Sequence, residues 1–394
     1  MTELVPVKLH AKLSASGSEK WMTCTPSMRM EEQYPDTQTD FSREGTFAHD
    51  VFENMLKYEL GMISSKEYKA KRKEQEQHEF WSNELLDHVL DAHTRALERV
   101  NAAKKRCKDP VFMIEQRLDF SPWVPEGFGT GDLVIITDDL VEVLDLKYGK
   151  GIYVDGENNS QMRLYALGAY NQFGMLYDIN RVRTLVLQPR LSNYTGEELA
   201  IEELLDWAEN KVAPAAKLAW NGEGELVAGD HCVDGFCRAR FTCPKRAEAA
   251  LAVAQSDFAL TPPELLSMEQ IADILPKADL AIDWLNDIKD YALKQAAKGN
   301  PVPGHKLVEG RSKRVYSDAN LIALRLKNHG FNEAMIYERS LLGITAMEKL
   351  LGKAEFTRIL GDLISKPSGK PTLVPDSDKR PAITVSESPD TDFS

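Results

Sequence analysis

The chain has 394 residues, which is enough for two or three domains of ordinary size. Hydrophobic residues make up 43% and charged residues 28%, a balance typical of globular proteins with a sizeable core. No apolar run reaches the roughly 18 residues of a membrane span, and the N-terminal stretch lacks the apolar core and cleavage site of a secretory signal. We therefore expect a cytoplasmic protein without a membrane partner.

The net charge of −13 argues against a protein that coats nucleic acid, because such proteins are usually basic. It does not argue against an enzyme that acts on DNA, since carboxylates that hold divalent cations make a site acidic and local basic patches still contact phosphates. Residues 104–106, 238–246 and 311–314 are candidates for such patches. Each one by itself is more typical of a solvated face.

The first predicted elements are helices and then strands. Residues 41–108 have apolar residues at helical spacing, and the very polar run 66–77 indicates a solvated face or a mobile lid. Three short segments rich in β-branched residues follow, which we predict to be strands, and the last two form a hairpin about Asp138 and Asp139. These strands are 111–120, 131–138 and 140–149.

The pattern then alternates between helix and strand. We predict a helix at 159–174, a strand at 181–190 and a long amphipathic helix at 197–220. The fold class is therefore α/β, with a mixed sheet flanked by helices. The predicted domains are a core at 1–255, a mostly helical C-terminal domain at 256–365 and a disordered tail at 366–394, where Pro, Ser, Asp and Thr dominate.

Two aspartates and a lysine lie on the two strands of the predicted hairpin. Asp145 and Lys147 are two residues apart and therefore point to the same face of their strand. Pairing about the hairpin turn brings Asp132 opposite Asp145. An Asp-x-Lys triplet alone is weak evidence, because surface strands often carry alternating charges.

The chemistry that needs such a set is phosphodiester hydrolysis. Carboxylates hold Mg²⁺ or Mn²⁺, which neutralises charge on the phosphate and lowers the pKa of a bound water. A neighbouring lysine orients that water, accepts its proton or stabilises the transition state. The triplet therefore makes the hairpin the candidate catalytic site.

With their neighbours, these residues resemble the RecB-type branch of the PD-(D/E)xK nucleases. That branch has a four-part signature, which is specific in combination although each part is weak alone. The four parts occur here in order as Gly45-Thr46-Phe47-Ala48-His49, Gly129-Thr130-Gly131-Asp132, Asp145-Leu146-Lys147 and Gln161-Met162-Arg163-Leu164-Tyr165. The resemblance covers roughly residues 12–250.

The resemblance implies a PD-(D/E)xK core and a role for each matching residue. The metal, Mg²⁺ or Mn²⁺, would be held by His49, Asp132, Asp145 and the backbone carbonyl of Leu146. Lys147 would act on the water, while Gln161 and Tyr165, on one face of the following helix, would orient the site and contact the DNA backbone. The chain departs from the family name in one place, since Gly131 precedes Asp132 where the name has Pro.

Four of the five cysteines form a second candidate site. The run HCVDGFCRARFTCP contains Cys232, Cys237 and Cys243, and Cys24 lies far upstream. RecB-type nucleases of the AddB and CRISPR-adaptation kinds have a similar split, and the resemblance implies a structural [4Fe–4S] cluster. Zinc, held by four Cys or by three Cys and His231, is the alternative, and ordinary buried thiols are another. The fifth, Cys107, lies outside the pattern and we expect a plain thiol.

The whole chain resembles an uncharacterised phage and prophage protein family. We therefore expect a metal-dependent deoxyribonuclease, an exonuclease or end-processing enzyme, that acts on DNA in a phage-infected or lysogenic bacterial host, with a recombinase, helicase or single-strand-binding protein as a further partner. The motif G-x-x-x-x-G-K-[ST] is missing, so any unwinding needs such a partner. The alternatives are a nuclease-fold protein that grips DNA ends without cutting, and a structural protein of a phage replication assembly.

Overall fold

The computed structural model describes residues 11–35, 39–255, 268–308, 319–330 and 350–360, together with positions 336, 347 and 363. The chain divides into two compact units, Met1–Leu307 and Val308–Ser394. Helices α11 (Ala319–Asn328) and α14 (Lys353–Leu360) belong to the second unit. The predicted tail and the basic stretch 311–314 lie outside the described residues, and the predicted boundary after residue 255 stays a prediction.

The first unit contains a five-stranded mixed sheet in which the spatial order follows the chain. Strands β3 and β4 are parallel and the other neighbours are antiparallel. Ile136 pairs with Val141, so the turn between β2 and β3 lies at 137–140 and the predicted hairpin about Asp138 and Asp139 is confirmed. The strands are β1 (Val111–Asp119), β2 (Phe128–Ile136), β3 (Leu140–Leu146), β4 (Arg181–Leu187) and β5 (Gly196–Ala200).

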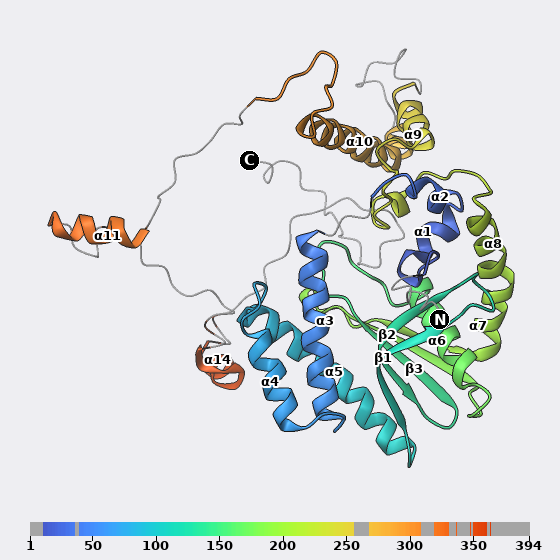
Figure 1. Ribbon diagram of the computed structural model, residues 1–394, viewed down its shortest axis with the longest axis vertical. Helices are drawn as coiled ribbons and strands as arrows, with labels where there is room; N and C mark the ends of the chain where they lie inside the picture. Colours follow the sequence, from blue (N-terminus) through green and yellow to red (C-terminus); the bar gives the residue numbers. More distant parts are fainter. Residues whose placement is uncertain are drawn as a thin grey trace, which may run out of the picture. The chain divides into compact units, whose positions relative to one another are not determined.

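Helices cover both faces of this sheet (Figure 1). The predicted helical region 41–108 is confirmed as three helices, whose N-termini are capped by the hydroxyls of Thr39, Ser64 and Ser82. They are α3 (Asp40–Glu59), α4 (Ser65–Gln75) and α5 (Asn83–Arg106). Apolar residues of α3 and α5 form one core with Leu133, Leu144 and Leu146 of the sheet.

The second core lies on the opposite face, under α6 (Ser160–Phe173). Val141 and Val143 alternate along β3 with residues of the first core and therefore face the opposite side of the sheet. They pack in the second core, together with Met162 and Ala166 of α6. The short helices α1 (Ser18–Thr23) and α2 (Ser27–Glu31) and the helical run 201–221 complete this layer. Within the described residues, no helix is both long enough and apolar enough to cross a membrane.

One predicted element is wrong at its start. Residues 197–200, predicted as the first turn of a helix, belong instead to the edge strand β5, where Arg183 of β4 pairs with Glu198. The helical run begins at Ile201 and continues as α7 (Ile201–Trp207), a π-helical turn, η3 (Ala208–Val212), and α8 (Ala213–Asn221). Backbone pairing with β4 and the cross-strand charges outweigh the helical propensity of this short segment.

Helix α10 (Met268–Ala297) packs on α9 (Pro244–Gln255), next to the cysteine-rich loop 229–243. Asp287 of α10 forms ion pairs with Arg240 and Arg246, and Arg246 is only 3% exposed in its side chain. Phe241 stacks on Tyr291 of the same helix. The predicted basic patch 238–246 is therefore largely used in internal ion pairs.

Candidate metal centre and cysteine pocket

The sheet forks at the two predicted aspartates. Pairing between β2 and β3 ends at Leu133 and Leu144, while β2 continues along β1 and β3 continues along β4. Asp132 and Asp145 are the next residues beyond that last pair, and both are buried. The backbone N–H of Leu146 donates a hydrogen bond across the fork to Oδ2 of Asp132 at 2.5 Å. The two carboxylates are thus neighbours, as the hairpin predicts.

Helix α3 contributes His49 to one side of the fork. Its Nδ1 lies 2.9 Å from Oδ1 of Asp132. Burial lowers the pKa of the imidazole, but the charge and hydrogen bond of Asp132, together with the charge of Asp145, outweigh that effect, so the pKa of His49 reaches about 9. In the metal-free protein, His49 and Asp132 therefore form an ion pair at neutral pH.

The other side of the fork holds the remaining predicted residues. Nζ of Lys147 lies 2.9 Å from Oδ2 of Asp145 and donates to Oε1 of Gln161 at 2.8 Å. Nε2 of Gln161 in turn donates to the Tyr165 hydroxyl at 3.0 Å and approaches Oδ1 of Asp145 at 3.5 Å. Burial raises the pKa of Asp145, and the Lys147 ammonium opposes that rise. These four side chains form one connected polar group.

Tyr165 also explains why a glycine lies three residues before Asp132. A Cβ atom at Gly129 would lie 2.4 Å from Cε1 of the Tyr165 ring. Since such a contact is too short for any side chain, the ring and the glycine backbone pack directly against each other. The second and fourth parts of the sequence signature therefore meet in space. Burial also raises the pKa of the Tyr165 phenol, which stays neutral.

Sequence reasoning missed one residue of this centre, Glu115 on β1. A carboxylate oxygen of Glu115, one of Asp132 and a ring nitrogen of His49 all lie within 4.8 Å of one another. The residue as a whole is exposed, but partial burial of its carboxylate and the charge of Asp132 raise the pKa of Glu115 to about 7. Its φ of 50° lies in the left-handed region, which non-glycine residues seldom adopt within a strand.

The unusual backbone of Glu115 coincides with a reversal of the strand alternation. Ile114 contributes to the core under α3 and α5, whereas Leu118, an even number of residues later, belongs to the core under α6. On β2, Leu133 faces the core under α3 and α5. Gly131, two residues earlier, would face the same core in a regular strand, yet a Cβ atom there would contact Leu118 in the core under α6. Asp132 lies at this reversal. It therefore faces His49 instead of following Val134 to the α6 side.

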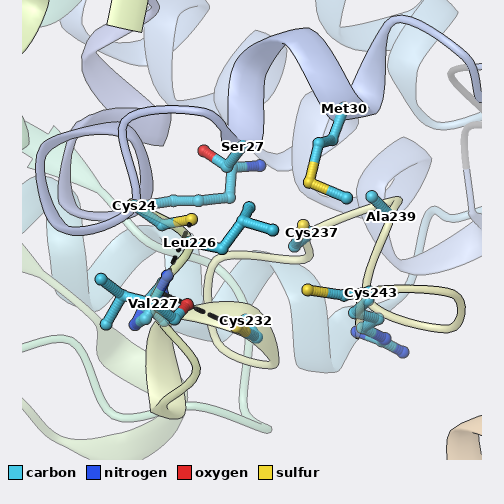
Figure 2. Close-up of a pocket in the computed structure, with 12 residues that line it drawn as sticks. Cys24, Ser27, Met30, Leu226, Val227, Cys232, Cys237, Ala239 and Cys243 are labelled. Atoms are coloured by element: carbon cyan, nitrogen blue, oxygen red, sulfur yellow. Dashed lines mark hydrogen bonds between the residues drawn. The ribbon is translucent and has the colours of Figure 1, made fainter. Parts of the chain in front are cut away.

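The four cysteines of the predicted second site line one small cavity (Figure 2). Cys24 follows α1, Cys232 ends the short helix η4 (Asp230–Cys232), and Cys243 precedes α9. All four thiols are buried, and main-chain atoms of Val227 lie between Cys24 and Cys232. Cys107 is elsewhere, with its sulfur 3.7 Å from Asp138. The segments joined at this cavity are about 200 residues apart.

Polar contacts hold the N-terminal segment against the cysteine loop. Lys20 pairs with Glu31 at 2.8 Å and donates to the carbonyl of Gly235 at 3.0 Å. Glu31 also accepts the backbone N–H of Arg238 at 2.7 Å. Burial raises the pKa of the Cys237 thiol to about 11, with Glu31 adding to the rise. Without a bound cation, this thiol is protonated at neutral pH.

Comparison with protein families adds one result. A family model described as "Protein of unknown function (DUF2800)" matches residues 10–381, which is most of the chain.

Proposed function

The chain belongs to the DUF2800 family, and we propose that it is a metal-dependent DNA nuclease, an exonuclease or end-processing enzyme, with a RecB-type PD-(D/E)xK core. One observation carries the proposal. His49, Asp132, Asp145, Lys147 and Gln161 come from four separate elements and meet at the fork of the sheet. Charged side chains are costly to bury, and a hydrolytic centre is a recognised reason for gathering them.

The donor atoms fit a divalent cation such as Mg²⁺ or Mn²⁺. The set combines carboxylate oxygens with one imidazole, and hard cations prefer oxygen ligands. Oδ2 of Asp145 is buried and, apart from its ion pair with Lys147, has no hydrogen-bond partner. A cation would satisfy the lone pair of this oxygen that the Lys147 ammonium leaves free. His49, Asp132, Asp145 and the carbonyl of Leu146 would hold the cation, which supplies charge neutralisation at the phosphate and a more acidic water.

The remaining polar residues would act on the water and the scissile phosphate. Lys147 is oriented from two sides, by Asp145 and by Oε1 of Gln161, so its ammonium has a defined position. From there it would orient the attacking water or stabilise charge that develops on a phosphate oxygen. Gln161, held by the Tyr165 hydroxyl, would keep Lys147 in place. Hydrolysis would then proceed by in-line attack on phosphorus.

At the second site we propose a structural [4Fe–4S] cluster bound by Cys24, Cys232, Cys237 and Cys243. A tetrahedral zinc ion, with Zn–S bonds of about 2.3 Å, needs sulfur atoms roughly 4 Å apart. The sulfur atoms here are spread more widely, since within the described residues no three of them lie within 4.8 Å of one another. That spacing favours a cluster, in which each thiolate binds a different iron.

The experiment is a cleavage assay on purified full-length protein. With Mn²⁺, labelled linear DNA should be degraded, and Asp132→Asn should abolish the degradation. Comparing linear, end-blocked and circular DNA then separates exonuclease from endonuclease action. Binding of DNA ends without cleavage would contradict the enzyme and support a nuclease-fold end-binding protein.

In the phage setting that we propose, a recombinase, helicase or single-strand-binding protein would supply or protect the DNA end.

A further inference from the structure

Arg117 on β1 has no role in the function proposed above, although it lies two residues from Glu115, at the edge of the same centre. We infer that Arg117 and Thr130 of β2 together bind a phosphate of the DNA strand, next to the phosphate that is hydrolysed, and that Phe128 holds the guanidinium in position. This inference rests on the proposed function, because it takes the ligand to be the DNA that the centre would cleave.

Arg117 and Thr130 face the α3 side of the sheet. Leu118 packs in the core under α6, so Arg117 beside it points to the opposite face. On β2, Cβ atoms at Gly129 and Gly131 would contact side chains of the α6 core, so Thr130 between them also points away from α6. Arg117 and Thr130 are register partners in the pairing of β1 with β2, and their side chains are therefore neighbours on that face.

This part of the face is open to solvent. The core under α3 and α5 includes Ile114 of β1 and Leu133 of β2, but within the described residues it includes nothing after Ile114 on β1 or before Leu133 on β2. Arg117 and Thr130 lie beyond that border, and both are exposed. Asp132 lies two residues from Thr130, which is roughly 7 Å along the strand. A DNA strand whose scissile phosphate lies at Asp132 can therefore place the next phosphate over Arg117 and Thr130.

The guanidinium of Arg117 lacks the ion pair that the other arginines of this unit have. Every other arginine at residues 11–35 and 39–255 pairs with a carboxylate, whereas Arg117 forms no ion pair within the described residues. Its guanidinium carbon lies instead 3.5 Å from the centre of the Phe128 ring. Glu115 and Asp119 are nearby on the same strand, so carboxylates are not lacking. A permanent positive charge is thus held over an aromatic ring and available to an anion.

A phosphodiester suits this pair of side chains. The guanidinium presents several N–H donors that match phosphate oxygens, and threonine hydroxyls also bind the DNA backbone. The charge of Arg117 offsets the carboxylates of Glu115 and Asp132, which by themselves repel a DNA strand. Contacts of this kind read the backbone and not the bases, so the site would accept DNA of any sequence.

Arg95 on α5 provides a matched control. Its side chain is 45% exposed, and its guanidinium carbon lies 5.0 Å from the centre of the Tyr194 ring, so it too is an arginine over an aromatic ring. It pairs with Glu98, however, and belongs to a helix and not to the face formed by β1 and β2. Arg95→Gln and Arg117→Gln remove the same charge. A general effect of net charge on DNA binding predicts equal losses, whereas a phosphate contact predicts a loss at Arg117 alone.

The test is binding of fluorescently labelled linear DNA, single-stranded and duplex, to the full-length protein, measured by anisotropy in Mn²⁺ at several salt concentrations. The parent protein and all variants carry Asp145→Asn, so that the DNA stays intact. Arg117→Gln should weaken binding about tenfold or more. The slope of the logarithm of the binding constant against the logarithm of salt concentration should become shallower by about 0.9 for duplex or about 0.7 for single strands.

The other variants separate the charge from the hydrogen bond. Arg117→Lys should keep the slope of the parent protein, because it keeps the charge. Thr130→Val should weaken binding about fivefold without a change in slope, because it removes a neutral hydrogen bond. Arg95→Gln should bind DNA like the parent protein.

Unchanged affinity and slope in Arg117→Gln would overturn the inference, even if the protein cleaves DNA. Equal losses in Arg95→Gln and Arg117→Gln would overturn it as well, and so would a parent protein that binds neither form of DNA. If the expected losses are found but the chain with Asp145 intact does not hydrolyse DNA, the proposed nuclease function fails and the phosphate site stands.

Discussion

The backbone N–H of Leu146 donates a hydrogen bond to Oδ2 of Asp132 across the fork between β2 and β3. This contact joins the two halves of the candidate centre, because Oδ1 of the same carboxylate contacts His49 on α3. Asp132 is thereby fixed in orientation by two elements that are far apart in the chain. One buried carboxylate therefore contacts both sides of the fork.

The contact between Gly129 and Tyr165 predicts a sharp steric effect. Gly129→Ala places a methyl group where the Tyr165 ring lies, so the ring and Gln161 must move. Overpacking of this kind lowers the free energy of unfolding by about 1–3 kcal/mol, and we expect a loss of Mn²⁺-dependent activity as well. Urea unfolding and the cleavage assay measure the two effects.

Gly149→Ala is the matched control, since nothing lies within 4 Å of a Cβ atom at that position. Tyr165→Leu, combined with Gly129→Ala, should restore part of the stability but not the activity. A Gly129→Ala protein that is as stable and as active as the unmutated chain would show that the ring does not pack there.

The cysteine pocket predicts a difference between two buried thiols. Cys24→Ser should lose the bound iron and the broad visible absorption of a cluster, because Cys24 lines the shared cavity. Cys107→Ser should keep both, because Cys107 lies near Asp138 instead. Iron, zinc and sulfide analysis of anaerobically purified protein measures the outcome. A colourless protein with one zinc per chain would contradict the cluster.

The ion pairs of Asp287 predict how firmly α10 is attached to the cysteine loop. Asp287→Ala leaves Arg246 buried without its partner, and breaking a buried pair in this way costs about 3–5 kcal/mol. We expect proteolysis within 268–297 to become much faster in this variant. Asp290→Ala, an exposed change on the same helix, should behave like the unmutated protein. Equal cleavage rates for both variants would show that the pair does not hold the helix.

The pair of His49 and Asp132 predicts a pH dependence of the metal-free protein. The pKa of His49 is raised in the fold, so its stabilisation is present in full below pH 6.5 and is lost as the pH rises through about 9. Urea unfolding with a chelator should therefore show a stability difference between the unmutated chain and His49→Gln that shrinks between pH 6.5 and about 9. A difference that stays constant or grows with pH would contradict the ion pair.

The sequence predicted this fold best where a regular period holds. The hairpin about Asp138 and Asp139 and the pairing of Asp145 with Lys147 follow from a strand period of two and a short turn. The same period does not predict the position of Glu115, because the alternation reverses there and the neighbouring sequence gives no sign of a positive φ. The residues of β5 have helical propensity, and only their pairing with β4 makes them a strand.

The sequence predicts one part of the candidate centre better than the other. The spacing of Gln161 and Tyr165 predicts that they share a helix face, and the family resemblance implies that this face orients the site; the contact of Gln161 with Lys147 agrees with that expectation. The sequence does not predict the fork between β2 and β3, since the fork depends on where backbone pairing stops. That point is set by which neighbour each strand follows, a tertiary property that local patterns do not contain.

The proposed nuclease activity is tested most directly by the initial rate of Mn²⁺-dependent hydrolysis of linear DNA, measured for the unmutated protein and for Asp145→Asn. Asp145 is buried at the fork, and the substitution keeps its shape while it removes the charge that pairs with Lys147 and that, in the proposed centre, would hold the cation. Removal of a group of this kind reduces rates by about 10² to 10³ or more. We predict clear hydrolysis by the unmutated protein and at least that loss in the variant. Equal rates in the two proteins, or no hydrolysis by either, would contradict the nuclease.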